Sequence, residues 1–189
     1  MNGQQAQQIE KEAQNMSLEI GFKRLSDNAI LPTKAHATDS GFDLFAAQDV
    51  IIAPGETVVV PTDIAVQLLK GYEAQVRPRS GITSKTKLRV QLGTIDNGYI
   101  AGIGVIIDNI YRKGDLPRKF YYGVDGKAIG RSYEIEGLRE VPEGTYLIRK
   151  GDKIAQLVVQ PIPATVAVEI TGELEDSDRG ADGFGSSGV

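Results

Sequence analysis

The sequence predicts a single principal domain of the all-β class. Its 189 residues suit one sizeable core, and from Leu18 onward short apolar runs are separated by dipeptides that favour tight turns. These dipeptides are Pro54-Gly55, Lys70-Gly71, Asn97-Gly98, Asp125-Gly126 and Glu143-Gly144. No segment after Leu18 carries the apolar stripe of a long helix. A sandwich, jelly roll or barrel is therefore favoured over alternating strands and helices.

Two runs show the alternation that is typical of strands. They are Ile64, Val66 and Leu68 in the first half of the chain, and Val166, Val168 and Ile170 near its end. Successive side chains of a strand point to opposite faces, so each run predicts a strand with one apolar face.

The N-terminal residues 1–16 differ from the rest of the chain. They are rich in Gln and Glu with few apolar anchors, so we expect a flexible leader, followed by the domain itself over residues 17–178. The leader lacks the cationic and then apolar pattern of a signal peptide, and it contains no run long enough to span a bilayer. The expected compartment is the cytoplasm, without a membrane partner.

Composition restricts the chemistry further. The formal net charge is -4, so no global basic field favours duplex nucleic acid, and any phosphate site must be local. The chain has no Cys and only His36, which excludes a disulfide framework and a thiolate or multi-histidine zinc site. A metal would be held by carboxylates, substrate oxygens and water, which indicates Mg²⁺.

A charged, Tyr-rich segment at about 110–144 interrupts the rhythm of strands and turns and has the character of an insertion. It holds Tyr111, Tyr121, Tyr122 and Tyr133, four of the chain's seven tyrosines. One interpretation is two decorated hairpin strands and a loop, since strands favour Tyr. The other is a surface that binds a partner protein, because Tyr and Arg are enriched at protein contacts.

The C-terminal residues 179–189 contain four glycines and predict a mobile arm. The stretch from Gly183 to Gly188 matches the string of a dinucleotide-binding loop, but that motif requires a following helix and only Val189 remains. Opened backbone amides, two serine hydroxyls and Arg179 can instead wrap a polyphosphate, while Phe184 can stack on a base. A plain disordered end is the alternative interpretation.

Two further segments can contact phosphate. Arg77-Pro-Arg-Ser-Gly81 ends an alternating strand and enters a turn, where a guanidinium, a hydroxyl and a glycine amide can converge on one phosphate. A solvated strand end is the alternative. Gln156 interrupts an apolar run, so its amide needs a hydrogen-bond partner from the core or from a ligand.

Two other segments carry carboxylates beside turns. Gly93-Thr-Ile-Asp-Asn-Gly-Tyr99 predicts a β-hairpin whose Asn-Gly turn follows Asp96, and the mouth of such a hairpin can admit a planar ligand. Asp39 and Asp43 share a face if the chain is extended there, and either can hold Mg²⁺ through water. For both segments the alternative is a carboxylate that caps its own turn.

Taken together, five segments resemble, in order, the five motifs of the trimeric dUTPase family. They are Ala37-Thr-Asp-Ser-Gly-Phe-Asp-Leu44, Pro78-Arg-Ser-Gly81, Gly93-Thr-Ile-Asp-Asn-Gly-Tyr99, Gly151-Asp-Lys-Ile-Ala-Gln156 and Arg179-Gly-Ala-Asp-Gly-Phe-Gly-Ser-Ser-Gly188. The resemblance spans about residues 18–189 apart from the insertion. It implies a distorted jelly roll of the β-clip type and a homotrimer with active sites between subunits. It also implies that each glycine-rich C-terminal arm is swapped onto a neighbour's site.

The resemblance further implies Mg²⁺-assisted attack of water on the α-phosphate of dUTP, which yields dUMP and pyrophosphate. That reaction keeps uracil out of DNA and supplies dUMP for dTMP synthesis. Asp96 would activate the water, Tyr99 would pack on the deoxyribose, and the backbone of Thr94 and Ile95 would read uracil. The other implied roles are phosphate contacts for Arg79, Ser80, Gly81 and Gln156, a water-mediated Mg²⁺ contact for Asp43, and closure of the arm by Arg179, Phe184, Gly185, Ser186 and Ser187.

The chain departs from the family pattern at Ala101, where a Gly usually stands, and in lacking an Asn just before Gly93. Its Tyr-rich segment resembles the extra insert of phage-encoded members, which would place the protein in the cytoplasm of a host cell. Two alternatives stay open. One is a dCTP deaminase-like enzyme of the same fold, and the other is a nucleotide-gated regulator that binds a partner through residues 110–144.

Overall fold

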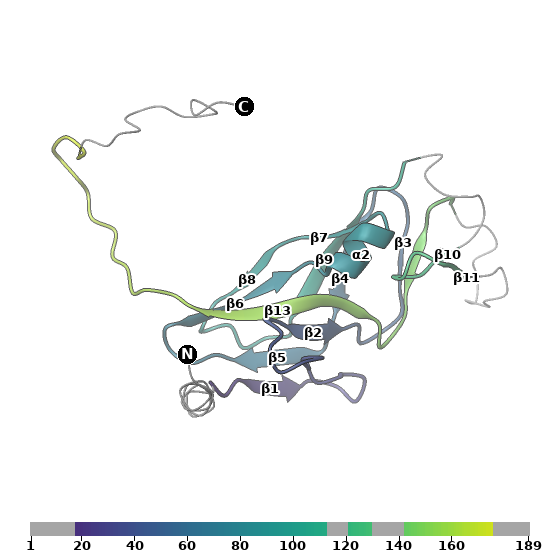
Figure 1. Ribbon diagram of the computed structural model, residues 1–189, viewed down its shortest axis with the longest axis horizontal. Coiled ribbons are helices and arrows are strands. Elements are labelled where there is room, and N and C mark those ends of the chain that lie inside the picture. Colours follow the sequence, from purple (N-terminus) through teal and green to yellow (C-terminus); the bar gives the residue numbers. More distant parts are fainter. Residues whose placement is uncertain (1–17, 113–120, 130–141, 176–189) are drawn as a thin grey trace, which may run out of the picture.

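Strands dominate the computed structural model, which describes residues 18–112, 121–129 and 142–175 (Figure 1). The strands are β1 (Gly21–Arg24), β2 (Phe42–Phe45), β3 (Val50–Ile52), β4 (Thr57–Pro61), β5 (Ile64–Gln67), β6 (Tyr72–Arg77), β7 (Leu88–Val90), β8 (Gly93–Ile95), β9 (Gly104–Asn109), β10 (Tyr121–Tyr122), β11 (Ala128–Ile129), β12 (Tyr146–Ile148) and β13 (Lys153–Pro161). In the part of the chain that the structure describes, one short helix, α2 (Ser80–Lys85), joins β6 to β7. Within the described ranges, no helix is long and apolar enough to cross a membrane.

The strands form one sheet in the order β2-β13-β6-β8, a second in the order β11-β10-β12-β3, a third in the order β4-β9-β7, and the pair β1-β5. The described pairings are antiparallel except for the one between β10 and β12. Figure 1 shows the long strand β13 lying between β2 and β6, so the end of the domain pairs with its beginning.

The sheet β2-β13-β6-β8 has one apolar face and one polar face. Ala74, Val76 and Leu157 point into the core and are at most 4% exposed. The intervening residues Gln75 and Arg77 point the other way, as the period of two requires. The core therefore lies on one side of this sheet, and its other side is left for polar side chains.

Helix α2 stands where a turn was predicted after Arg77, and that prediction is wrong. A six-residue helix with one Gly and three Ser or Thr residues has neither the length nor the propensity to be recognised from its sequence. Tertiary contacts stabilise it instead. Ile82 is buried in the core, and the hydroxyl of Thr86 donates to the Ile82 carbonyl at 2.7 Å. The guanidinium of Arg89 donates to further carbonyl groups around the helix end.

The strand predicted around Val166, Val168 and Ile170 is absent from this single chain. Residues 162–175 contain no regular element and leave the body of the domain (Figure 1), and these three side chains are 86%, 79% and 64% exposed. A strand requires a hydrogen-bonding neighbour, and this part of the chain has none within the described residues.

The hairpin predicted at Asn97-Gly98 is also wrong in its pairing. A turn does form, with the Tyr99 amide donating to the Asp96 carbonyl at 3.0 Å. However, β8 pairs with β6, whereas β9 pairs with β4 and β7. The two-residue hairpin turn that Asn-Gly favours requires positive φ angles, and neither Asn97 nor Gly98 has one. The Asn97 side chain instead donates to the carbonyl groups of Leu68 and Leu69.

In the insertion, residues 121–129 form the β10–β11 hairpin, as the first interpretation of this segment predicted. The base of the insertion is held by contacts between its two ends. The Asn109 amide donates to the Gly144 carbonyl at 2.9 Å, and the Tyr111 hydroxyl donates to Glu143 at 2.5 Å. A Cβ atom on Gly144 would lie 2.2 Å from the Tyr111 ring, so only glycine fits there.

Candidate active site

Three of the predicted motifs meet on the polar face of the sheet β2-β13-β6-β8. Gln156 in β13 is the register partner of Asp43 in β2 on one side and of Arg77 in β6 on the other. Directly opposed residues of antiparallel strands share a face, so these three side chains form a row across the sheet.

Asp43 is the centre of the charge cluster at the end of this row. Its carboxylate lies 3.1 Å from Nε of Arg79 and 2.7 Å from Nζ of Lys153, and the residue is only 8% exposed. Arg79 also donates to the Lys153 carbonyl at 3.3 Å. Two cations at one nearly buried carboxylate fix the position of the Arg79 side chain more strongly than an exposed pair would.

Lys153 is a residue of this cluster that the sequence analysis did not single out. Because Lys153 and Gln156 are three residues apart, regular alternation places them on opposite faces of β13. A register shift between Lys153 and Ala155 adds one residue, which brings the lysine to the side of Asp43. The signal in the sequence was the position of Lys153 inside the Gly151 to Gln156 motif.

Gln156 connects this row to the segment that precedes α2. Its amide donates to the Pro78 carbonyl at 3.0 Å, so the protein itself supplies one of its hydrogen-bond partners. Gly41 makes this packing possible. A Cβ atom there would lie 3.1 Å from the Gln156 amide oxygen and 3.2 Å from Val158. Pro78 and Arg79 are thereby held against both β2 and β13.

Ser80 and Gly81 are exposed beside Arg79 at the start of α2. The amides of Ile82 and Thr83 donate to the Arg79 carbonyl, whereas first-turn amides such as those of Ser80 and Gly81 have no acceptor within a helix. A Cβ atom on Gly81 would meet no atom within 4 Å. A cationic side chain, a hydroxyl and free amides therefore border open space, which suits the oxygens of a phosphate.

The second group of predicted residues lies on β8 and the turn that follows it. Asp96 is exposed, and its carboxylate has no hydrogen-bond or ion-pair partner among the described residues. The Tyr99 ring is 44% exposed, and its hydroxyl donates to the Gly102 carbonyl at 2.9 Å. The Ile95 side chain is buried in the core, which leaves only its backbone for a ligand, whereas Thr94 is exposed.

The single chain does not bring these two groups together. By the register of β6 and β8, Asp96 lies at the level of Glu73, whereas Gln156 lies at the level of Arg77. Four residues of strand span about 13 Å, and the two strand spacings between β8 and β13 add about 10 Å sideways. The Asp96 backbone is therefore roughly 16 Å from that of Gln156.

The sequence predicted that Asp39 and Asp43 share a face and that either can hold Mg²⁺ through water. Asp39 does not share a face with Asp43, because it lies in a turn before β2 where its carboxylate accepts from the His36 amide at 2.9 Å. Both Asp43 oxygens are already engaged by cations, so a direct bond from Asp43 to a metal does not fit this arrangement. Within the described ranges, no three acidic or histidine side chains gather as metal ligands. A metal held mainly by substrate oxygens and water stays compatible with these residues.

Five residues that were predicted to contact the ligand lie outside the described residues. They are Arg179, Phe184, Gly185, Ser186 and Ser187.

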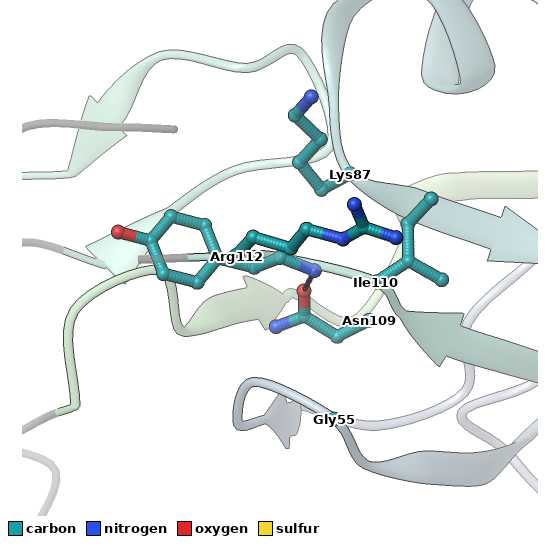
Figure 2. A pocket seen from close by; sticks show the side chains of 6 residues that line it. Gly55, Lys87, Asn109, Ile110 and Arg112 are labelled. Atoms are coloured by element: carbon teal, nitrogen blue, oxygen red, sulfur yellow. Dashed lines mark hydrogen bonds between the residues drawn. The ribbon is translucent and has the colours of Figure 1, made fainter. Parts of the chain in front are cut away.

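A hollow of about 570 Å³ lies at the base of the insertion (Figure 2). Its lining includes Lys87, Asn109, Tyr111 and Arg112, and Figure 2 shows Lys87 and Arg112 on the side away from Gly55. None of the predicted site residues lines this hollow. The hollow is therefore separate from both groups of site residues.

The fold and the site together define a β-sheet protein with two cationic side chains gathered at one carboxylate, and with a second, exposed carboxylate after another strand of the same sheet. The family model named dUTPase matches residues 27–114 and 143–188, and the match omits most of the insertion. The deoxyuridine 5'-triphosphate nucleotidohydrolase of Clostridium kluyveri is 36% identical over 174 residues, which cover 91% of this chain and 99% of that protein. The chain belongs to the dUTPase family, the enzymes that hydrolyse dUTP, and the expected family is confirmed.

Solved structures of phage enzymes are similar over most of the chain. The Staphylococcus bacteriophage 80alpha dUTPase with dUPNHPP has a TM-score of 0.81 and 37% identity, covering 92% of this chain and 100% of that one. The dUTPase of phage phi11 of S. aureus, described for its species-specific insert, has a TM-score of 0.74 and 32% identity, covering 82% of this chain and 98% of that one. The expected likeness to phage-encoded members is confirmed.

Proposed function

We propose that this dUTPase hydrolyses dUTP at sites assembled between copies of the chain, as a homotrimer. The separation of Asp96 from Arg79 and Gln156 carries this proposal. In one chain the backbone of the predicted base Asp96 lies roughly 16 Å from that of the predicted phosphate ligand Gln156, toward the other end of the sheet. If the Asp96 turn of one copy lies against the Arg79 cluster of another, a single nucleotide can contact both.

The phosphate side of the site consists of Arg79, Ser80, Gly81 and Gln156. Arg79, oriented by Asp43, and the free amides next to it neutralise charge on the phosphate oxygens. Mg²⁺ would supply further positive charge there when bound to the triphosphate, and Asp43 would contact it through water. A variant of the phi11 dUTPase has been described for its coordination of a structural Mg(II) ion, which supports a role for the metal in this family.

The nucleoside side consists of β8 and its turn. The backbone of Thr94 and Ile95 reads the uracil edge, and the exposed ring of Tyr99 packs on the deoxyribose. Asp96 takes a proton from a water molecule as the water oxygen bonds to the α-phosphorus and the bond to the pyrophosphate oxygen breaks. The absence of a competing partner for the Asp96 carboxylate among the described residues supports its role as the base.

The C-terminal arm completes the site on a neighbouring copy. The exposed apolar row of Val166, Val168 and Ile170 supports this exchange, because a strand-like segment with one apolar face and no partner among the described residues suits pairing with another chain. Beyond it, Phe184 covers the base, and Arg179 with Gly185, Ser186 and Ser187 holds the outer phosphates.

Mixing two inactive variants tests the shared site. Asp96→Asn and Arg79→Ala are expected to lose most activity when expressed alone. When they are co-expressed, some sites combine an intact Asp96 from one chain with an intact Arg79 from another, so activity recovers to about a quarter of the wild-type rate for random mixing of chains. Pyrophosphate release from dUTP measures the rate, and differently tagged chains verify that mixed oligomers form. Mixed oligomers without any recovery would place each whole site within one chain.

A further inference from the structure

The β10–β11 hairpin of the insertion rests directly on the end of α2. Gly126, in the hairpin turn, has a φ of 75°, and a Cβ atom on it would lie 2.3 Å from the carbonyl oxygen of Lys85 and 3.2 Å from its carbonyl carbon. Lys85 is the last residue of α2. The backbone of the turn and the backbone of the helix end are therefore in contact, and no side chain larger than glycine fits between them.

A second contact connects the same hairpin to the residues just after α2. Tyr122 in β10 is the register partner of Tyr146 in β12, and their ring centroids are 6.0 Å apart. The hydroxyl of Tyr146 accepts a hydrogen bond from the Lys87 amide at 2.9 Å. Tyr122 and Tyr146 are 4% and 1% exposed, so this connection is part of the core. The insertion thus supports the chain on both sides of Thr86.

Helix α2 is so short that the contacts of the hairpin at its C-terminal end can affect the position of its N-terminal end. It has six residues, so the contact at Lys85 and the exposed Ser80 and Gly81 are little more than one turn apart, about 8 Å along the helix. A helix of this length is not stable through its own hydrogen bonds and depends on its packing. A displacement at Lys85 is therefore expected to shift the segment that begins at Arg79.

We propose that the β10–β11 hairpin is a positioning element for the phosphate-binding segment, and that Gly126 and the Tyr122–Tyr146 pair hold Arg79, Ser80 and Gly81 in the geometry that binds the triphosphate. This inference rests on the proposed role of those three residues. It gives the insertion a function within the catalytic domain. This function is separate from the binding of a partner protein at the surface of the insertion.

The variant Gly126→Ala tests the contact, and Gly55→Ala is its matched control. Both glycines have a positive φ, 75° and 80°, so alanine is strained similarly at each position. A Cβ atom at Gly55 meets nothing within 4 Å, whereas one at Gly126 meets Lys85. The difference between the two variants therefore isolates the contact with α2 from the backbone strain.

Three measurements on the full chain are expected to separate the variants. Gly126→Ala should raise the KM for dUTP and weaken binding of a non-hydrolysable dUTP analogue by about tenfold relative to Gly55→Ala, with a smaller change in kcat, since a factor of ten corresponds to a modest misplacement of phosphate contacts. Binding of deoxyuridine, which has no phosphate, should stay unchanged. Amide hydrogen exchange over residues 80–85 should be faster in Gly126→Ala alone.

Tyr146→Phe is a second, milder variant in case Gly126→Ala does not fold. It keeps the ring and removes the acceptor of the Lys87 amide, and we expect changes in the same direction but smaller. Equal KM, binding and exchange in Gly126→Ala and Gly55→Ala would overturn the proposal, as would faster exchange with unchanged analogue binding. The proposed function fails by a different result, namely wild-type protein that releases no pyrophosphate from dUTP.

Discussion

The carboxylate of Asp43 lies 3.1 Å from the guanidinium of Arg79, and this ion pair joins the first two motifs of the site. Asp43 lies in strand β2, and Arg79 is the residue that precedes α2. The ion pair therefore fixes the one cationic side chain of the Pro78 to Gly81 motif against the sheet. The same carboxylate also holds Lys153. Asp43 is therefore first of all the residue that positions Arg79.

Replacing Asp43 with Asn should weaken substrate binding. The variant removes the negative charge between two cations, and a partly buried pair of this kind contributes about 1–2 kcal/mol, so the KM for dUTP should rise about tenfold. Steady-state kinetics at saturating Mg²⁺ measure this effect. Asp27→Asn, which removes the same charge from an exposed carboxylate that has no ion pair among the described residues, should leave the KM unchanged. A raised Mg²⁺ requirement with an unchanged KM at saturating metal would mean that Asp43 acts only through the metal.

Replacing Asp96 with Asn should separate turnover from binding. The amide keeps the shape of the side chain but cannot accept the proton from water, so kcat should fall by about 10²–10⁴. Because Asp96 is exposed and makes no contact that the fold needs, thermal stability and the affinity for a non-hydrolysable dUTP analogue should both be retained. Undiminished pyrophosphate release by this variant would remove Asp96 from the mechanism.

Replacing Gly81 with Ala should raise the stability of the protein and also weaken its binding of dUTP. A methyl group meets no atom within 4 Å, and alanine favours a helix over glycine by about 1 kcal/mol, so the melting temperature should rise by a few degrees. The same methyl group would occupy the space proposed for a phosphate oxygen at the amide, so the KM for dUTP should rise about tenfold. Ser84→Ala in the same helix is the control, with a normal KM. A normal KM in Gly81→Ala would show that the phosphate does not bind next to the Gly81 amide.

Replacing Val168 with Asp should disrupt assembly. The side chain is 79% exposed in one chain, but the proposed exchange of arms buries it, and losing a buried valine removes about 2 kcal/mol per copy before the charge is counted. Sedimentation should show a shift from trimer toward monomer. Ala167→Asp, on the alternate face of the same segment, should leave the trimer intact. Equal behaviour of the two variants would contradict a paired strand here.

Asp152 gives a prediction for pH. Burial raises the pKa of its carboxyl group, the charges of Asp125 and Asp49 raise it further, and a hydrogen bond from the Arg149 amide opposes them. A raised pKa means that the folded state retains the proton longer than the unfolded state. The resulting stabilisation is present below the ordinary pKa of about 3.9 and is lost as pH rises through the folded value.

The side chain of Asp152→Asn is neutral at every pH, so the variant should not lose stability through ionisation at this position. The free energy of unfolding of the variant, relative to the wild type, should therefore increase between about pH 3.5 and pH 7. Urea unfolding at several pH values measures this difference. A difference that stays constant with pH would show that Asp152 ionises alike in the folded and unfolded chains.

The sequence by itself determined the class of the fold and the segments that carry the chemistry. Alternation at Ile64, Val66 and Leu68 identified strand β5, in which Ile64 and Val66 are buried, as is Leu68 directly after its end, because the period of two is a local property of the backbone. The order of the five motif segments likewise identified the family, and that order is fully present in the chain.

Only the tertiary structure decided how those segments meet. Lys153 reaches Asp43 because a bulge in β13 shifts its register, and Asp96 stands far from Arg79 because β8 runs antiparallel to β6 and ends beside the start of that strand. Neither the bulge nor the choice of pairing partner leaves a periodic signal, since both depend on contacts between strands distant in sequence. For the same reason the alternation at Val168 could not tell whether this segment finds a neighbouring strand among the described residues, and it finds none there.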